Sequence, residues 1–264
     1  EGGALFAGDY HTAPFIARAL IPRFATSSPS PAYIAHVAEV FEPNAANNFQ
    51  EVLKAILLYP EARSCQLSEQ YGFGKLREPV IRLTNFLKAF HLEANPAADF
   101  PMELECFYDH VGQAPLDAPS VFNFYRPDYA PQGSIEQRYL VAPEFQIMTA
   151  PNTIGYINEL EQRVNRQEYT QIDCNPDASS AEEAIDYGDD LAYLRKMDLE
   201  PWLAWAEEPE TLVDYLDLVL ANGLLSESTR QIIQAAIEQL PTALERFKMA
   251  TYLILLSPDY IILK

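Results

Sequence analysis

The stretch that decides the fold reads, over residues 209–258, PETLVDYLDLVLANGLLSESTRQIIQAAIEQLPTALERFKMATYLILLSP. Apolar residues recur in it at spacings of three and four, which is the period of an amphipathic helix with one buried face. Asn222–Gly223 is typical of a helix C-terminus, and Pro241 cannot continue a helix. These signals predict three consecutive helices. Ser226 or Ser228 caps the second, and the third begins near Thr242.

The same helical period extends outward from this stretch to the start of the chain, and strand signals are nearly absent. Prolines separate the periodic segments. Several can stand in the first turn of a helix, where a backbone N–H has no partner within the helix and its absence costs nothing. The pattern predicts an all-α fold, an irregular array of several helices. Outside 209–258, the expected helices run from about Ala13 to Phe24, from Pro31 after a Ser30 cap, from an Asn47 or Asn48 cap to Tyr59–Pro60, from Glu78 to Leu92 and from Thr153 to Val164.

The segment from about 95 to 151 has no sustained period and is rich in proline and aromatic residues. A long irregular segment inside a compact domain is uncommon and is usually functional or packed over a core. We predict that it is ordered, and in particular that Phe122 to Tyr129 is packed, because its four aromatic rings carry too much apolar area to remain in water.

With 264 residues, the chain is long enough to bury a sizeable core. We expect a single helical domain over 1–264, the C-terminal part of a longer protein, with a subdivision into 1–165 and 190–264 as the alternative. The boundary of that subdivision would be the acidic loop 168–190.

The net charge of −20 is concentrated in the second half of the chain, most of it between Glu168 and Asp217. Nucleic-acid affinity comes largely from Lys and Arg, so such a surface repels phosphate backbones and anionic lipid. We therefore expect no nucleic-acid partner. No run approaches 18 continuous apolar residues, which predicts no membrane span.

Part of the acidic loop resembles a calcium-binding loop. Oxygen-bearing side chains alternate with other residues, which places ligands at positions one, three, five and seven, as in an EF-hand. Ala178 replaces the turn glycine, and Ala184 stands where the bidentate glutamate belongs. A calcium site and a solvated acidic loop both remain open. The candidate ligands are Asp173, Asn175, Asp177 and Ser179.

A second group of residues is a candidate polar site, because two segments concentrate Lys and Arg with carboxylates beside glycine, proline and aromatics. Three interpretations stay open: buried ion pairs that tie the irregular segment to the helices, a ligand pocket, and an acid–base catalytic site. No recognisable nucleophile motif or phosphate-binding loop accompanies them. The residues are Arg18, Arg23, Lys75, Arg77, Glu78, Asn123, Tyr125, Arg126, Asp128 and Glu144.

Three other residue types carry less information. Cysteine is present at 65, 106 and 174 without CxxC spacing, which permits at most one disulfide plus a free thiol. The four histidines form no metal motif, and His110 is expected on the surface. Trp202 and Trp205, three apart on an apolar helix, are expected in the core.

Several sequence blocks, in order along nearly the whole chain, resemble the C-terminal half of the domain-of-unknown-function 1800 family of exported bacterial proteins. They read PFIAR at 14–18, SPSPAY at 28–33, KAILL at 54–58, PEAR at 60–63, FGKLREP at 73–79, SVFNFYRPDY at 120–129, VAPEFQ at 141–146 and YLILLSPDY at 252–260.

The resemblance implies export to the periplasm or the cell surface, and a longer chain with an export signal and a further helical half ahead of this region. It also implies that the genes often lie beside those of a second uncharacterised exported family, a possible protein partner. It supplies no catalytic residues. A non-catalytic structural or partner-binding role is favoured. The alternatives are a cell-envelope hydrolase acting on polysaccharide at the polar cluster, and a calcium-stabilised surface protein.

Overall fold

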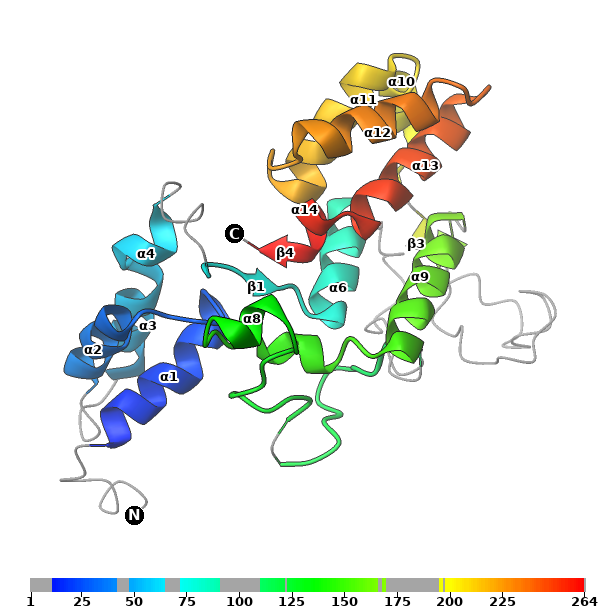
Figure 1. The fold of residues 1–264 in the computed structure, drawn as a ribbon. Coiled ribbons are helices and arrows are strands. Elements are labelled where there is room, and N and C mark those ends of the chain that lie inside the picture. Colours follow the sequence, from blue (N-terminus) through cyan, green and yellow to red (C-terminus); the bar gives the residue numbers. More distant parts are fainter. Residues whose placement is uncertain are drawn as a thin grey trace. The chain divides into compact units, whose positions relative to one another are not determined.

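The computed structural model describes residues 11–41, 48–64, 72–90, 110–121, 123–165, 168–169, 195–196 and 198–263. Helices make up most of these residues, which confirms the all-α prediction (Figure 1). The chain forms two compact units. Unit 1 is drawn from Glu1–Leu76, Tyr125–Gln146 and Ile262–Lys264, and unit 2 from Arg77–Phe124 and Ile147–Ile261. The subdivision at the acidic loop stays a prediction.

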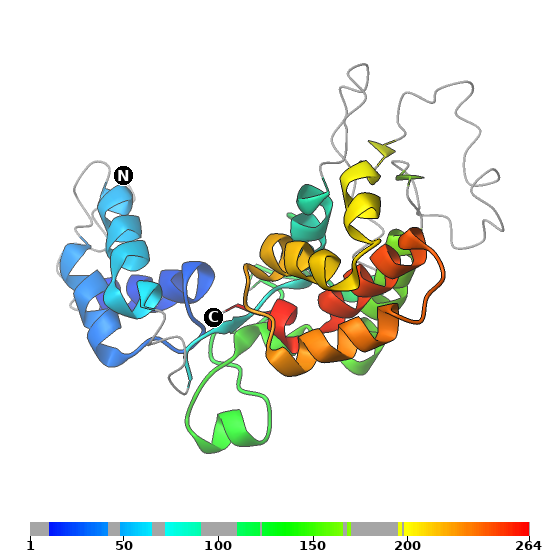
Figure 2. The ribbon, with the colours of Figure 1, turned by 90° about the horizontal axis from the view of Figure 1, so that it is seen from above.

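Unit 1 is built around four helices that pack against one another in chain order, blue to cyan in Figure 2. Three of them confirm the helices predicted between residues 13 and 59. Its remaining described elements are short and come from the middle and the end of the chain. The elements are α1 (Thr12–Phe24), α2 (Pro31–Val40), α3 (Asn48–Leu58), α4 (Pro60–Arg63), β1 (Lys75–Leu76), α8 (Ser134–Gln137), the 3-10 helix η2 (Pro143–Gln146) and β4 (Ile262–Leu263).

The core of unit 1 lies among the first three helices. Tyr33 on α2 is fully buried, stacks on Tyr59 with ring centroids 4.4 Å apart, and donates a hydrogen bond of 2.5 Å to the carbonyl oxygen of Ile56. Ser30 caps α2 as predicted, because its side chain accepts from the Tyr33 N–H at 3.1 Å. The other buried members are Ala17, Ile21, Val37, Val52 and Ile56.

A two-stranded antiparallel sheet joins the end of the chain to unit 1. Leu76 on β1 pairs with Ile262 on β4, and Lys75 pairs with Leu263. Gly74 precedes β1 with φ of +120°, and a Cβ placed there would lie 2.8 Å from the Leu263 carbonyl oxygen. Only glycine allows this close approach.

Unit 2 contains the three helices predicted from 209–258 together with helices from earlier in the chain. α12 packs along α13, and α13 also contacts α9 and α11. Its elements are α6 (Pro79–Ala89), α9 (Ala150–Asn165), β2 (Glu168–Tyr169) paired antiparallel with β3 (Arg195–Lys196), α10 (Glu200–Trp205), α11 (Pro209–Leu216), the π-helical segment η4 (Asp217–Ala221), α12 (Glu227–Ile237), α13 (Ala243–Leu256) and α14 (Pro258–Ile261).

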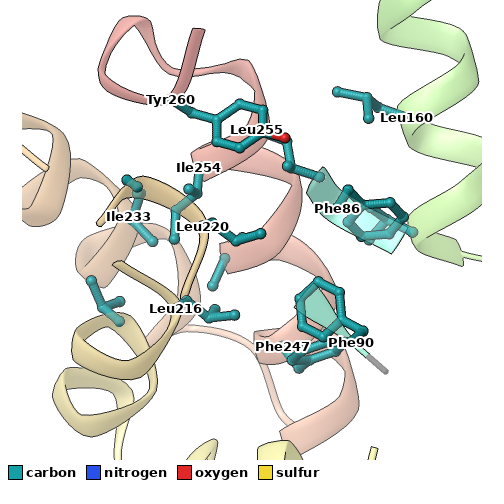
Figure 3. Close-up of a cluster of buried hydrophobic side chains, with 14 of the residues drawn as sticks. Phe86, Phe90, Leu160, Leu216, Leu220, Ile233, Phe247, Ile254, Leu255 and Tyr260 are labelled. Atoms are coloured by element: carbon teal, nitrogen blue, oxygen red, sulfur yellow. The ribbon is translucent and has the colours of Figure 1, made fainter. Parts of the chain in front are cut away.

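The core of unit 2 is a continuous cluster of apolar side chains, part of which is drawn in Figure 3. Phe90 lies at an aromatic centre: its ring centroid is 5.3 Å from that of Phe86, 5.0 Å from that of Trp202 and 5.4 Å from that of Phe247. Trp202 is therefore a core residue, and the partly buried Trp205 packs against the same cluster, as the helical spacing predicted.

Capping interactions agree with the sequence signals at the ends of these helices. Ser226, rather than Ser228, caps α12 by accepting from the Thr229 N–H at 3.3 Å. Thr242 and Glu245 form a capping box at the start of α13. Asn222 takes the left-handed conformation at the preceding helix end, with φ of 58°.

The helix before Asn222 departs from the regular α-helix expected there, because its last turn is the π-helical η4. Asp217 opens that turn and is buried. Its Oδ1 accepts from the Leu225 N–H at 3.1 Å, and its Oδ2 accepts from Arg230 Nη2 at 2.6 Å. The carboxylate thus links η4 to the following turn and to α12.

The described part of the irregular segment is packed at some positions and exposed at others. Tyr125 is buried, and Phe124 and Tyr129 are partly buried. Ser28 Oγ accepts from the Val141 N–H and donates to the Val141 carbonyl, both at 2.8 Å. Within residues 124–129, the Tyr129 carbonyl accepts from the Ala142 N–H at 2.9 Å, and Tyr125 is buried, which agrees with the packing predicted for this stretch. Phe122 lies outside the described residues.

Candidate functional site

The ten residues of the predicted polar site divide between the two units. Arg77, Glu78 and Asn123 belong to unit 2. The structure brings some members of each group together, but it describes no single cluster that holds all ten. The unit 1 members are Arg18, Arg23, Lys75, Tyr125, Arg126, Asp128 and Glu144.

Lys75 and Glu144 form a buried ion pair, which we call the Lys75–Glu144 brace. Lys75 Nζ lies 3.5 Å from Glu144 Oε1, and the two side chains are only 8% and 1% exposed. The ammonium group also donates to the carbonyl oxygens of Pro22 at 2.8 Å and Arg23 at 3.3 Å. These carbonyls lie in the last turn of α1, where a cation interacts favourably with the helix dipole.

The carboxylate of the brace is held from its other side by the segment that follows α1. Ser27 Oγ donates to Glu144 Oε2 at 2.8 Å, so one oxygen is hydrogen-bonded and the other faces Lys75. The neighbouring Thr26 Oγ1 accepts from the Gly74 N–H at 3.1 Å and donates to the Gly74 carbonyl at 3.2 Å. The brace therefore joins α1, β1 and η2 within unit 1.

Of the other unit 1 members, Tyr125 is buried, whereas the two arginines of α1 and the pair Arg126 and Asp128 are exposed. Arg23 Nη1 donates to the Tyr125 hydroxyl, and the Arg23 guanidinium carbon lies 4.7 Å from the centre of the Tyr125 ring. Arg126 and Asp128 approach to 3.9 Å with side chains 68% and 79% exposed. Arg18 is exposed on α1. Exposed pairs of this kind contribute little to stability.

In unit 2 the predicted residues have aromatic and amide neighbours. The Arg77 guanidinium carbon lies 4.3 Å from the centre of the Tyr260 ring, and Arg77 Nη1 donates to Asn85 Oδ1 at 3.2 Å. Glu78 Oε2 accepts from Gln113 Nε2 at 2.5 Å. Asn123 is partly buried and has φ of 73°.

An arginine that the sequence motifs did not single out lies at the centre of this group. Arg82 on α6 is fully buried, and its Nε donates to the Arg77 carbonyl at 2.6 Å. Its guanidinium carbon lies 4.9 Å from the centre of the Tyr156 ring, and its backbone carbonyl accepts from the Tyr260 hydroxyl at 2.5 Å. We call Arg77, Arg82, Tyr156 and Tyr260 the arginine–tyrosine cluster.

Burial dominates the electrostatics of this cluster. It lowers the pKa of Arg82, with the nearby tyrosines acting in the opposite direction. Burial also raises the pKa of the Tyr156 hydroxyl, and it raises the pKa of Tyr260 to about 12 against the opposing effect of Arg77. Both phenols are therefore neutral at physiological pH.

A second group missed from the sequence is centred on Glu159 of α9. Glu159 Oε1 contacts His110 Nδ1, and its Oε2 accepts from Arg163 Nε at 2.9 Å. The His110 side chain is 44% exposed, in agreement with the surface position expected for it. Gly155 permits the arrangement, because a Cβ there would lie 1.9 Å from the His110 carbonyl oxygen.

The proposed calcium ligands Asp173, Asn175, Asp177 and Ser179 lie outside the described residues, as do all three cysteines, at 65, 106 and 174. Among the residues that the structure describes, no three His, Cys, Asp or Glu side chains gather in a group that could hold a metal ion. In the same part of the chain, every helix is too short or too polar to cross a bilayer.

Comparison with known proteins places the chain in a family. The family model described as a protein of unknown function, DUF1800, matches residues 4–262, nearly the whole chain. The chain therefore belongs to this family, as its sequence blocks indicated. Neither the curated proteins nor the solved structures contain a match.

Proposed function

We propose that this chain is a non-catalytic helical protein, exported to the periplasm or the cell surface, that binds a partner protein there. The observation that carries the proposal is that the Lys75–Glu144 ion pair is buried away from solvent. An acid–base carboxylate must reach the substrate. The Glu144 carboxylate is 1% exposed and is engaged by Ser27 and Lys75, which fits a structural role.

A hydrolase acting on envelope polysaccharide has less support. Glycoside hydrolysis commonly needs two carboxyl groups on either side of the scissile bond. Glu144 is sealed in the brace, and Glu159, 7% exposed, is held by His110 and Arg163. The calcium-stabilised surface remains a further proposal, resting on the sequence pattern of residues 173–179 alone.

Three exposed apolar side chains on neighbouring elements of unit 2 are the contacts that we propose for a partner. Leu218 on η4 is 63% exposed, Leu224 in the following turn 55%, and Ile232 on α12 66%. Exposed large apolar side chains, where they form a contiguous patch, mark protein interaction sites. The Asp217 carboxylate accepts hydrogen bonds from the Leu225 N–H and from Arg230, which connects η4, the turn after it and α12. The three apolar side chains therefore stand on elements that are held together.

We expect Ile232→Glu to weaken binding to the exported protein encoded beside genes of this family by at least about tenfold, because it places a charge at an apolar contact. Gln231→Glu is the matched control: it adds the same charge at an exposed position about 100° around the same helix. Calorimetric titration of the two purified proteins measures Kd. Equal Kd values for both variants would rule out this surface as the binding site.

Export is tested separately. When the full-length gene is expressed in its own bacterium, we expect the protein in the periplasmic or surface fraction, with a cytoplasmic enzyme as the marker of leakage. Recovery of the full-length protein in the cytoplasmic fraction, together with that marker, would contradict export.

A further inference from the structure

Two buried cations in unit 2 have no carboxylate partner among the residues that the structure describes. Arg77 is 4% exposed and Arg82 is fully buried. Their contacts are with carbonyl, amide, thioether and aromatic groups. A buried charge is costly unless it is paired and hydrogen-bonded. The contacts of the two guanidinium groups with the Tyr260 and Tyr156 rings offset only part of that cost.

The cluster's own hydroxyls do not supply the missing negative charge. The Tyr260 hydroxyl uses its proton to donate to the Arg82 carbonyl at 2.5 Å, and the Tyr156 hydroxyl donates to the Leu255 carbonyl at 3.4 Å. Both groups are therefore neutral donors. The positive charge of the two guanidinium groups is left without a counter-charge among the described residues.

The Arg82 guanidinium group has a short hydrogen bond at Nε, but its two terminal nitrogens lack strong acceptors among the described residues. Nε is fixed on the Arg77 carbonyl at 2.6 Å. Nη2 contacts the Met148 sulfur at 3.6 Å, and Nη1 has no hydrogen-bond partner among the described residues. The Tyr156 hydroxyl also interacts with this guanidinium group, but it is neutral and brings no negative charge. A thioether is a weak acceptor, whereas the two terminal nitrogens of arginine form a fork that matches two oxygens of a carboxylate or phosphate.

We propose that the Arg82 fork binds a small oxyanion, a carboxylate or a phosphate group, with Arg77 as the second cation of the site. The Met148 sulfur lies beside Nη2, where an oxygen of the anion would accept. The Met148 side chain is partly exposed, flexible and unbranched, so it can move aside to admit the anion. This site shares no residue with the brace or with the side chains proposed for the partner.

Thermal unfolding of the full chain tests the proposal, with sodium phosphate or sodium acetate compared with sodium chloride at equal ionic strength. We expect a saturable rise in Tm of about 3–6 °C at ten times the Kd of the better anion, because binding to the native state stabilises it by mass action. Comparison of the two salts shows which oxyanion the site prefers.

Arg82→Lys keeps the charge but removes the fork, and should abolish the anion-specific part of that rise. Arg126→Lys makes the same change at an exposed arginine and should leave it intact. An equal rise with chloride, or a full rise retained in Arg82→Lys, would overturn the proposal.

A measurement on the unaltered protein decides the matter even if Arg82→Lys fails to fold. The chain has four methionines, so the methyl signal of Met148 can be assigned in an NMR spectrum. It should shift on addition of the anion, with the same midpoint as the Tm effect. A Met148 signal that stays fixed while Tm rises would place the anion elsewhere and contradict the proposal.

Discussion

Replacing Phe90 with alanine is expected to lower the free energy of unfolding by about 3–5 kcal/mol, which is the range for large-to-small changes at a buried phenylalanine. The ring is 1% exposed and makes edge contacts with Phe86 and Phe247, which Figure 3 labels, and with Trp202. Its removal loses apolar burial and leaves a cavity that three aromatic rings cannot readily fill.

Phe15→Ala is the matched control, because the same atoms are removed from a side chain that is 69% exposed. We expect it to change the free energy by about 0.5 kcal/mol or less. Urea unfolding should be followed by tryptophan fluorescence, since both tryptophans belong to the unit 2 cluster. Equal losses for the two variants would contradict the core assigned to unit 2.

Replacing Glu144 with alanine should cost a similar amount, about 3–5 kcal/mol, for an electrostatic reason. The variant leaves the Lys75 ammonium buried with only the Pro22 and Arg23 carbonyls as partners. It also leaves Ser27 without its acceptor.

Asp128→Ala is the control for Glu144→Ala. It also removes a carboxylate from a pair with a cation, but that pair is exposed and 3.9 Å apart. We expect its cost to be below about 1 kcal/mol. Urea unfolding followed by far-ultraviolet circular dichroism measures both variants. A Glu144→Ala protein as stable as the Asp128→Ala protein would show that the brace contributes nothing.

The helices were predictable because their signals are local. A buried face at spacings of three and four, a serine or threonine cap and a terminating proline all lie within one helix length of the residues they affect. Ser226 and Thr242 illustrate this: each caps the helix that the pattern assigned to it. The π-helical turn was not predictable in this way, since Asp217 is held by Arg230 from the next helix.

The candidate site was only partly predictable because its contacts join distant parts of the chain. Ser27 meets Glu144 across 117 positions, and Tyr260 meets Arg82 across 178. Composition identified Lys75 and Glu144 as members of a polar network but could not pair them. One local signal was overlooked: Arg82 falls in phase with the buried Leu83 and Phe86 on α6, which indicates an arginine on the inward face.

The structural role of the Lys75–Glu144 brace is tested most directly by a double-mutant cycle with Lys75→Met and Glu144→Leu, measured by urea unfolding. Replacing both members of a buried ion pair with apolar residues of similar volume is often nearly neutral, whereas removing one is strongly destabilising. We predict that the double variant recovers most of the loss of Glu144→Leu, with a coupling energy of at least about 2 kcal/mol. Additive losses, with a coupling energy near zero, would contradict the structural role of the brace. Glu144 would then again be a candidate for binding a ligand.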